Sequence, residues 1–159
     1  PIMHQDKIQI NENVDALTLS KVLSKLGAKS IINAIDKIEK GEARFIEQNH
    51  GEATYAKKIL KNEGRINWNE SAKKVLAKIN GLNPNPGAWF MFNGERYKIL
   101  KAKISQANGK AGMVLSQNLE IACGKNAIKI IEIQRQGKKI QKVKEFLRGS
   151  DIKKDITLS

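Results

Sequence analysis

The sequence predicts an α+β fold in which a helical first part is followed by a small β-barrel. The main observation is a change in the spacing of apolar residues at segment 82–89, Leu-Asn-Pro-Asn-Pro-Gly-Ala-Trp. Before it, apolar residues recur at helical steps of three and four, and after it they follow strand-like spacing. Two prolines separated by Asn85 cannot continue a helix, because proline lacks an amide donor and restricts the residue before it. The segment therefore ends a helix and opens a β domain.

Helical patterns dominate the residues before this break. An apolar stripe over residues 19–26 predicts a helix that ends at Gly27, and a second stripe over residues 31–38 predicts a helix that ends at Gly41. Residues 1–10 alternate in places and predict a short strand. A short helix is expected through residues 55–60. A further helix begins near Ser71, and its buried face consists of Ala72, Val75, Leu76 and Ile79.

Strand patterns follow the break. Five short strands are expected at residues 88–93, 96–104, 112–116, 118–123 and 127–134, and turn residues such as Asn93-Gly94 separate them. A polar bend at Gly137 and a short helix over residues 143–147 come next, and the tail beyond Gly149 is expected to be loose. Five short strands with flanking helices favour an OB-like five-stranded β-barrel, a fold that commonly receives nucleic acid. Fold alone does not establish function.

Composition excludes several classes of protein. The chain has 159 residues, and 40% of them are hydrophobic, which suffices for a real core. No stretch approaches the ~18 apolar residues that a membrane span needs, and no segment resembles a signal peptide. Cys123 is the single cysteine and lies in an apolar, strand-like setting, so a role in core packing is favoured over catalysis. These features predict a cytoplasmic protein that does not enter a membrane.

Positive charge is concentrated in one part of the chain. Residues 1–50 contain seven basic and seven acidic side chains. Subtraction from the totals of 29 and 16 leaves 22 basic and nine acidic groups in residues 51–159, which therefore carry the whole net charge of +13. Lysine-rich composition bias is the alternative explanation, but it would load both parts alike. The asymmetry indicates a polyanionic partner for the second part.

The basic residues form three groups along the sequence. One lies in the segment before the break, one in the second expected strand, and one at and beyond the fifth. Strict alternation would divide the second group between the two faces of its strand, so a single cationic row requires a β-bulge near Ile99-Leu100. Such clusters attract phosphates without reading base sequence. The candidate RNA-binding residues are Lys57, Lys58, Lys61, Arg65, Arg96, Lys98, Lys101, Lys103, Lys125, Arg135, Lys138 and Lys139.

Motifs for catalysis and metal binding are missing from the sequence. His4 and His50 are isolated, and no Cys, His or carboxylate cluster has the spacing of metal ligands, so no metal is expected. Glycine-rich phosphate loops and Ser/His/Asp sets are also absent. Asp6, Glu12 and Asp15 are interpreted as solvated carboxylates rather than catalytic groups.

Several short motifs, in order and at characteristic spacing, resemble the C-terminal portion of the methionyl-tRNA formyltransferase family nearly end to end. Asn67, Asn85 and Ile140 depart from that pattern, where aspartate, tryptophan and methionine are usual. The matching motifs are Leu26-Gly27-Ala28, Gln48, Thr54-Tyr55-Ala56-Lys57-Lys58-Ile59, Ile66-Asn67-Trp68, Asn83-Pro84-Asn85-Pro86-Gly87-Ala88, Gly112-Met113-Val114-Leu115, Ala122-Cys123-Gly124, Gln134-Arg135-Gln136-Gly137-Lys138-Lys139 and Glu145-Phe146-Leu147-Arg148-Gly149.

The resemblance implies a division of the chain into three parts with different roles. Residues 1–45 would be the end of a Rossmann-like formyltransferase domain, residues 46–68 a basic linker, and residues 69–159 an OB-like tRNA-binding domain. The parent enzyme transfers a formyl group from 10-formyltetrahydrofolate to methionine on initiator methionyl-tRNA. Its catalytic Asn/His/Asp motifs and folate site would lie in a domain upstream of Pro1, so this chain alone is expected to bind no cofactor and to be inactive.

Two alternatives remain open at this stage. The chain could belong to a formyltransferase that acts on a sugar nucleotide, although that function gives no reason for a concentrated positive charge. It could also be an inactive orphan remnant of a split gene. Binding to tRNA separates the first alternative from the implied function.

Overall fold

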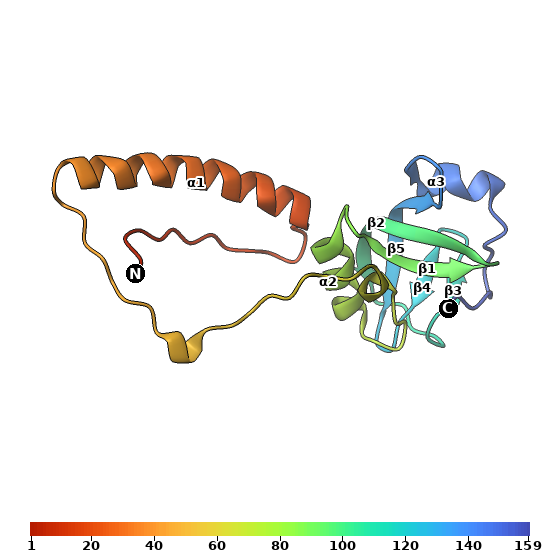
Figure 1. Ribbon diagram of the computed structural model, residues 1–159. Helices are drawn as coiled ribbons and strands as arrows, with labels where there is room; N and C mark the ends of the chain where they lie inside the picture. The colour runs from red at the N-terminus through yellow and green to blue at the C-terminus, as the bar shows by residue number, and fades with distance from the viewer. The chain divides into compact units, whose positions relative to one another are not determined.

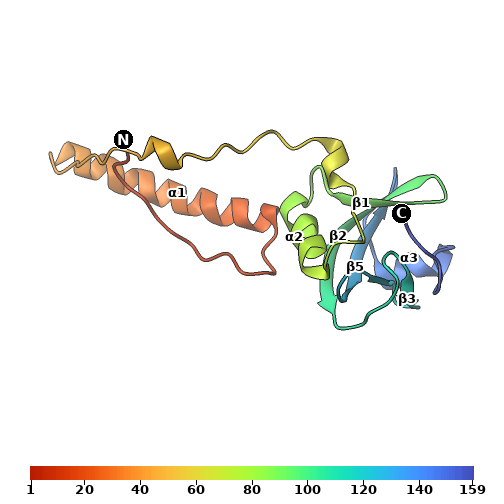
Figure 2. The same ribbon diagram turned by 90° about the horizontal axis from the view of Figure 1, so that it is seen from below.

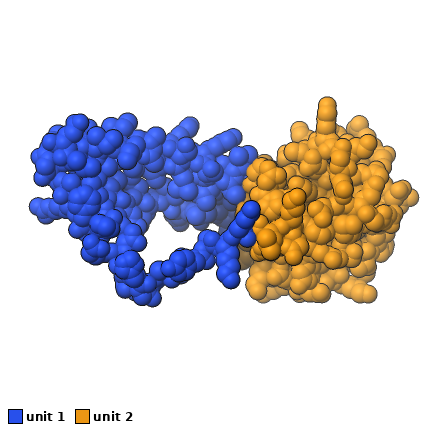
Figure 3. Space-filling view, viewed as in Figure 1, with its two compact units in different colours: residues 1–58 blue, residues 59–159 orange.

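The computed structural model describes all 159 residues, which form two compact units, residues 1–58 and residues 59–159 (Figure 3). The first unit contains helix α1 (Ala16–Glu39) and the 3₁₀ turn η1 (His50–Glu52). The second unit contains η2 (Lys61–Gly64), α2 (Ala72–Leu82), β1 (Ala88–Phe92), β2 (Glu95–Ser105), β3 (Val114–Ser116), β4 (Glu120–Ala122), β5 (Ala127–Arg135), β6 (Gln141–Lys142), α3 (Val143–Phe146) and η3 (Leu147–Gly149). Figure 1 labels its two α-helices and strands β1 to β5. None of the helices combines the length and apolar character that a membrane span requires.

Helix α1 is one continuous helix of 24 residues, so the predicted end at Gly27 is wrong. The reason lies in the apolar stripe, because Leu23, Gly27, Ile31 and Ile35 follow one another at steps of four and stay in phase across the glycine. The helix begins with a cap, since the Thr18 amide donates to Asp15 Oδ1 at 2.8 Å. The predicted end at Gly41 is confirmed: this residue follows the C-cap and has a φ of +71°.

Two other predictions for the first unit are wrong. Residues 3–10 form no strand, and only an isolated bridge joins Ile2 to Ile46. Residues 53–60 form no helix, and Tyr55 is 90% exposed. A single helical turn is unfavourable to nucleate unless it buries an apolar face, and this segment buries none.

Helix α2 forms as predicted. The Lys74 amide donates to Ser71 Oγ at 3.4 Å, which caps the first turn. The expected face, Ala72, Val75, Leu76 and Ile79, is buried together with Leu82. The helix ends at the proline-containing segment, where the Gly87 amide donates to the Leu82 carbonyl at 2.9 Å and the chain enters β1.

The strands β1 to β5 form one antiparallel sheet in the order β1-β2-β5-β4-β3 (Figures 1 and 2). Strand β6 pairs with β5 at Glu132 and Ile133. All five predicted strands are confirmed, and each end lies within two residues of the predicted one. Strands β3 and β4 are shorter than predicted. Asn93 and Gly94 both have positive φ, as a tight hairpin requires, and they join β1 to β2. Strand β6 was not predicted, because two residues are too few to give a periodic signal.

The hydrogen-bonded sheet is not a closed barrel, since no ladder joins its two ends, β1 and β3. The C-terminal tail lies along this gap. The Val114 amide donates to the Ile156 carbonyl at 2.8 Å, and the Met91 amide of β1 donates to the Ser159 carbonyl at 2.8 Å. Ile152 and Leu158 are buried in the core. The prediction of a loose tail is therefore wrong, because Ile152, Ile156 and Leu158 supply apolar surface that the polar composition of the segment obscured.

The core of the second unit lies between α2, the sheet and α3. Phe90 and Tyr97 stack at 5.5 Å between ring centroids, and Phe146 of α3 contacts Tyr97 edge-on at 5.8 Å. Trp68 lies 5.9 Å from Phe90, which brings the segment before α2 into the same core. This packing holds β1 and β2 rigidly in the positions on which the candidate site depends.

Candidate nucleic-acid interface

Four basic residues of β2 lie on one face of the sheet. The register of β2 against β5 shifts between Ile99 and Lys101 and again between Lys101 and Ala102. The first shift leaves Leu100 as the extra residue of β2, which is the β-bulge on which a single cationic row depends, and the second leaves Ile131 as the extra residue of β5. They place Lys98 opposite Gln134, Lys101 opposite Glu132, and Lys103 opposite Lys129. We call the row formed by Arg96, Lys98, Lys101 and Lys103 the cationic face.

Trp89 supports one end of the cationic face. It pairs with Lys98 across the β1–β2 ladder, and the Arg96 guanidinium lies 4.0 Å from the centroid of its ring. This distance is within the range of a cation–π contact, which holds the long arginine side chain over the sheet. Trp89 is only 8% exposed, so its ring packs against protein and is not an open platform for a base.

The segment before α2 brings two further candidates to this end. The Trp89 indole donates to the Lys61 carbonyl at 3.1 Å, and the Arg65 guanidinium lies 6.0 Å from the Trp89 ring. The chain can approach so closely because residue 64 is glycine: a Cβ there would lie 2.4 Å from the Gly87 carbonyl oxygen. Lys61 and Arg65 therefore belong to the same unit as the cationic face.

A hollow of about 290 Å³ lies beside Arg96 and Lys98. The Gln136 amide donates to the Arg96 carbonyl at 2.9 Å, and Gln134 Nε2 donates to the Lys138 carbonyl at 2.8 Å. These bonds fix the turn after β5 against the strand. The hollow is lined by Arg96, Lys98, Gln134, Arg135, Gln136 and Gly137. Its side chains are suited to phosphate oxygens and offer no nucleophile or general base.

Arg135 is already engaged by a carboxylate. Its Nε and a terminal nitrogen donate to the two oxygens of Glu95 at 2.5 and 2.7 Å, which is the bidentate geometry. These hydrogen bonds lower the pKa of Glu95 and raise that of Arg135. Sequence reasoning could not foresee this ion pair, because the two residues are 40 positions apart. The charge of Arg135 is thus less available to a polyanion than that of Lys98.

A second hollow, of about 460 Å³, lies at the other end of the cationic face. Ile131 and Val143 provide part of its apolar floor, and basic side chains surround them. Glu132 and Glu145 are the acidic residues among its lining. The basic residues are Lys103, Lys129, Lys142, Lys144 and Arg148. Only Lys103 was among the candidate RNA-binding residues, whereas Lys129, Lys142 and Lys144 belong to the basic group at and beyond the fifth expected strand. The i, i+4 spacing of Lys144 and Arg148 was the available sequence signal for the last two.

The remaining predicted residues lie elsewhere in the chain. Lys57 and Lys58 belong to the other unit, residues 1–58. Lys125 lies in the turn before β5, whereas Arg135 ends that strand. Eight residue steps along a strand span about 26 Å, so Lys125 and Arg135 cannot contact the same phosphate. Lys138 and Lys139 are exposed in the turn that follows β5.

The remaining chemically reactive groups are not assembled for catalysis. No cluster of three or more His, Cys, Asp or Glu side chains could hold a metal ion. Cys123 is buried, and desolvation raises the pKa of its thiol to about 11, which makes it a poor nucleophile. In the first unit Ser30 Oγ donates to the Asp6 carboxylate and lowers the pKa of Asp6. His4 also contacts Asp6, at 3.1 Å, so the hydroxyl is not paired with the imidazole as a catalytic base would require.

Comparison with known proteins gives one matching family. The family described as formyl transferase, C-terminal domain, matches residues 58–151. A methionyl-tRNA formyltransferase from Pelagibacter ubique is 48% identical over 153 residues, which cover 96% of this chain and 49% of the relative. One from Bradyrhizobium diazoefficiens is 40% identical over 152 residues, covering 93% and 49%. The chain thus spans about half the length of the curated relatives it matches.

Solved structures show the same fold. A variant of HypX from Aquifex aeolicus matches 93% of this chain and 28% of its own with a TM-score of 0.68 and 21% sequence identity. The complex of HypX with tetrahydrofolic acid matches 79% of this chain and 23% of its own, with a TM-score of 0.60 and 22% identity. At these identities the likeness concerns the fold.

Proposed function

Because this chain belongs to the family of formyl transferase C-terminal domains, we propose that it is the part of a methionyl-tRNA formyltransferase that holds initiator methionyl-tRNA. In the parent reaction a formyl group passes from 10-formyltetrahydrofolate to the methionine amino group. The observation that carries the proposal is the cationic face, in which a β-bulge aligns Arg96, Lys98, Lys101 and Lys103. Relatives bearing the enzyme's name support the substrate.

The chemistry of this face favours structured RNA over a small substrate. Lysine and arginine without an arranged set of base-reading groups neutralise phosphates whatever the sequence. Shape and backbone contacts are also the usual way in which proteins recognise double-stranded RNA. Trp89 is covered by Arg96 and the Lys61–Arg65 segment, which argues against base stacking as the main contact. We therefore assign the role of the face to phosphate contacts along the acceptor arm of tRNA.

The proposed organisation of the chain follows the family. Residues 1–45 end a Rossmann-like formyltransferase domain, residues 46–68 are a basic linker, and residues 69–159 form an OB-like tRNA-binding domain. The tail supports the last of these, because it hydrogen-bonds to β3 and to Met91 of β1 and so covers the opening between the sheet ends. Lys57 and Lys58 would extend the cationic surface along the linker.

The catalytic groups and the folate site lie, in this proposal, in an upstream domain. Helix α1 supports the presence of such a partner, since it buries no residue of its own and leaves Ile31, Ile32 and Ile38 more than half exposed. An apolar stripe of that length normally packs against another layer. The chain alone is then inactive in formyl transfer, and its cellular place is the cytoplasm, where translation begins.

Salt-dependent tRNA binding by the whole chain tests the proposal. If about six phosphates are neutralised, affinity falls on the order of a thousandfold between 50 and 200 mM salt. The double variant Lys98→Gln/Lys103→Gln should reduce the log–log salt slope by about two. The matched double variant Lys153→Gln/Lys154→Gln alters exposed tail lysines that line neither hollow and should leave the slope nearly unchanged.

Three results would contradict the proposal. Affinity that does not depend on salt would exclude a phosphate-based interface. Absence of tRNA binding would favour the alternatives, a sugar-nucleotide formyltransferase or an inactive remnant. Formyl transfer by residues 1–159 alone would mean that the catalytic groups are inside this chain.

A further inference from the structure

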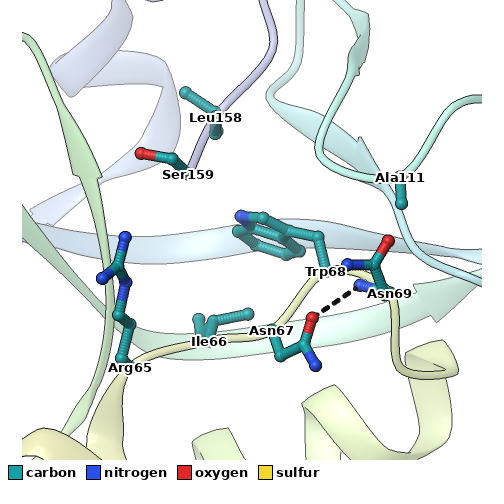
Figure 4. Close-up of a pocket in the computed structure, with 8 residues that line it drawn as sticks. All are labelled: Arg65, Ile66, Asn67, Trp68, Asn69, Ala111, Leu158 and Ser159. Carbon is teal, nitrogen blue, oxygen red and sulfur yellow. Dashed lines mark hydrogen bonds between the residues drawn. The ribbon is translucent and has the colours of Figure 1, made fainter.

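Two hollows of the second unit are large enough for a small ligand, since such sites usually measure ~300–1,000 Å³. The hollow in Figure 4, of about 360 Å³, lies between residues 65–69 and the C-terminal tail, and Arg65 is the one cation in its lining. The second hollow, at the Lys103 end of the cationic face, measures about 460 Å³. Its lining contains five cations and two carboxylates, so it carries an excess of positive charge. The second hollow is therefore the better match to an anionic ligand.

The second hollow has an apolar floor within an otherwise charged surface. The register of β5 against β2 skips Ile131, which is the extra residue of a β-bulge. The flanking residues Ile130 and Ile133 are buried in the core. Ile131 and Glu132 between them are half-buried, and both line the hollow. The bulge thus adds an apolar side chain to the cationic face, and Val143 of α3 extends the floor.

Glu132 places a carboxylate beside this floor. It is the register partner of Lys101 in β2 and of Lys142 in β6. A carboxylate repels phosphate, so a site for phosphate alone would gain nothing from it. An ionised carboxylate only accepts hydrogen bonds, and the exocyclic amino group of a base is a matching donor, as in the contact of Glu with cytosine N4. The hollow therefore offers an apolar surface for a base, an acceptor for its amino group and cations for a phosphate.

We propose that the second hollow binds one unpaired nucleotide of the RNA, with its base on Ile131 and Val143 and its amino group on Glu132. The inference deepens the proposed function and rests on it for the source of the nucleotide. Lys103 belongs both to the hollow and to the cationic face, so a nucleotide that leaves the RNA stack reaches the hollow where the row of phosphate contacts ends. Unpaired, splayed-out bases are also the usual targets of sequence-specific RNA recognition. Cytosine, adenine and guanine carry the amino group, and the site prefers them to uracil.

Nuclear magnetic resonance titration of the full chain with cytidine and uridine monophosphates tests the site. The two ligands share ribose and phosphate, but at position 4 of the base cytidine has an amino donor and uridine a carbonyl acceptor. The amide signals of Ile131 and Val143 should move with both ligands. Cytidine monophosphate should bind about 3–10-fold more tightly, which corresponds to one hydrogen bond at a half-buried position.

Two variants separate the acceptor from the floor. Glu132→Gln should abolish most of the preference, because an amide can pair with either base. The control Asp155→Asn removes the same charge from an exposed tail residue that lines none of the hollows described above, and it should leave the preference unchanged. Ile131→Ser should weaken both mononucleotides by about 3–10-fold, since it removes apolar surface and keeps every charge. An initiator tRNA transcript should displace bound cytidine monophosphate.

Each other outcome overturns the inference. Equal affinity for the two mononucleotides, or a preference that persists in Glu132→Gln, would mean that Glu132 reads no amino group. Inorganic phosphate that moves the same signals as far as cytidine monophosphate does would reduce the hollow to a phosphate site. Displacement by an acidic peptide but not by tRNA would assign the hollow to a protein partner. Salt-dependent tRNA binding that leaves cytidine monophosphate in place would retain the proposed function and overturn only the nucleotide site.

Discussion

Replacement of Gly64 by alanine should destabilise the second unit and release the segment that carries Lys61 and Arg65. A Cβ at this position would lie 2.4 Å from the Gly87 carbonyl oxygen and 3.0 Å from Trp89 Cδ1. Neither neighbour can move freely, because Gly87 is buried backbone and Trp89 is 8% exposed. The added methyl group therefore has to displace the segment or the loop before β1.

The size of the effect follows from these contacts. Overpacking of a filled site costs about 1–3 kcal/mol. Displacement would also break the hydrogen bond from Trp89 Nε1 to Lys61, worth about 0.5–1.5 kcal/mol. Reduced freedom of the unfolded chain offsets about 0.4–1 kcal/mol. The expected net loss in the free energy of unfolding is about 0.5–4 kcal/mol, which corresponds to about 4–8 °C in melting temperature for each kcal/mol.

Urea unfolding followed by tryptophan fluorescence measures this loss, because Trp68 and Trp89 both belong to the second unit. Gly81→Ala is the matched control: the same methyl group is added in α2, where nothing lies within 4 Å, and it should stabilise the helix by about 0.5–1 kcal/mol. A Gly64→Ala variant as stable as Gly81→Ala would refute the packing of the segment against β1.

Three further predictions concern the stability of the second unit and the reactivity of its cysteine. Leu158→Ala should lower the free energy of unfolding by about 2–5 kcal/mol, because Leu158 is 4% exposed in the core, whereas the exposed neighbour Thr157→Ala should change it little. The pKa of Glu95 is lowered from 4.5 by Arg135, so its contribution to stability is present above about pH 4.5 and is lost as pH falls through the folded-state value; Glu95→Gln should flatten this part of the pH–stability curve. Cys123, with a pKa of about 11, should react with iodoacetamide at pH 8 only as fast as the unit unfolds, and rapid labelling of native protein would contradict its burial.

Local signals predicted most of the second unit. The proline-containing break, the helical face of α2 and the Asn93-Gly94 hairpin each depend on residues close in sequence, and all three are confirmed. Predictions failed where the structure of a segment depends on contacts with residues distant in sequence, or where the segment lacks such contacts. The tail is ordered by hydrogen bonds to Gly112 and Val114, some 40 residues earlier, while residues 55–60 have no surface on which an amphipathic turn could pack. Gly27 was misread because a glycine within a continuing stripe does not end a helix.

The sequence predicts a single row of cations only on the condition that β2 contains a β-bulge. Strict alternation along β2 would divide its four cations between two faces. The sequence contains no residue that fixes where the register of β2 against β5 shifts. The structure contains a bulge at Leu100 of β2, and this bulge aligns the row. The pairing of Arg135 with Glu95 and the contribution of Lys129 and Lys142 depend on neighbouring strands, which the order of the chain does not reveal.

Trp89 contributes both to the packing of the second unit and to the positions of its basic side chains. Its ring lies between Arg96 on β2 and the Lys61–Arg65 segment, so loss of the ring would free both groups of cations without removing any charge. Long-range attraction to a polyanion depends on net charge, whereas the bound geometry depends on where the side chains are held. In the proposed complex, a variant that loses Trp89 and still folds would therefore associate with RNA at nearly the native rate and dissociate faster. The opposite pattern, slower association with unchanged dissociation, is the one expected from Lys98→Gln, which removes a charge from the half-buried Lys98 position.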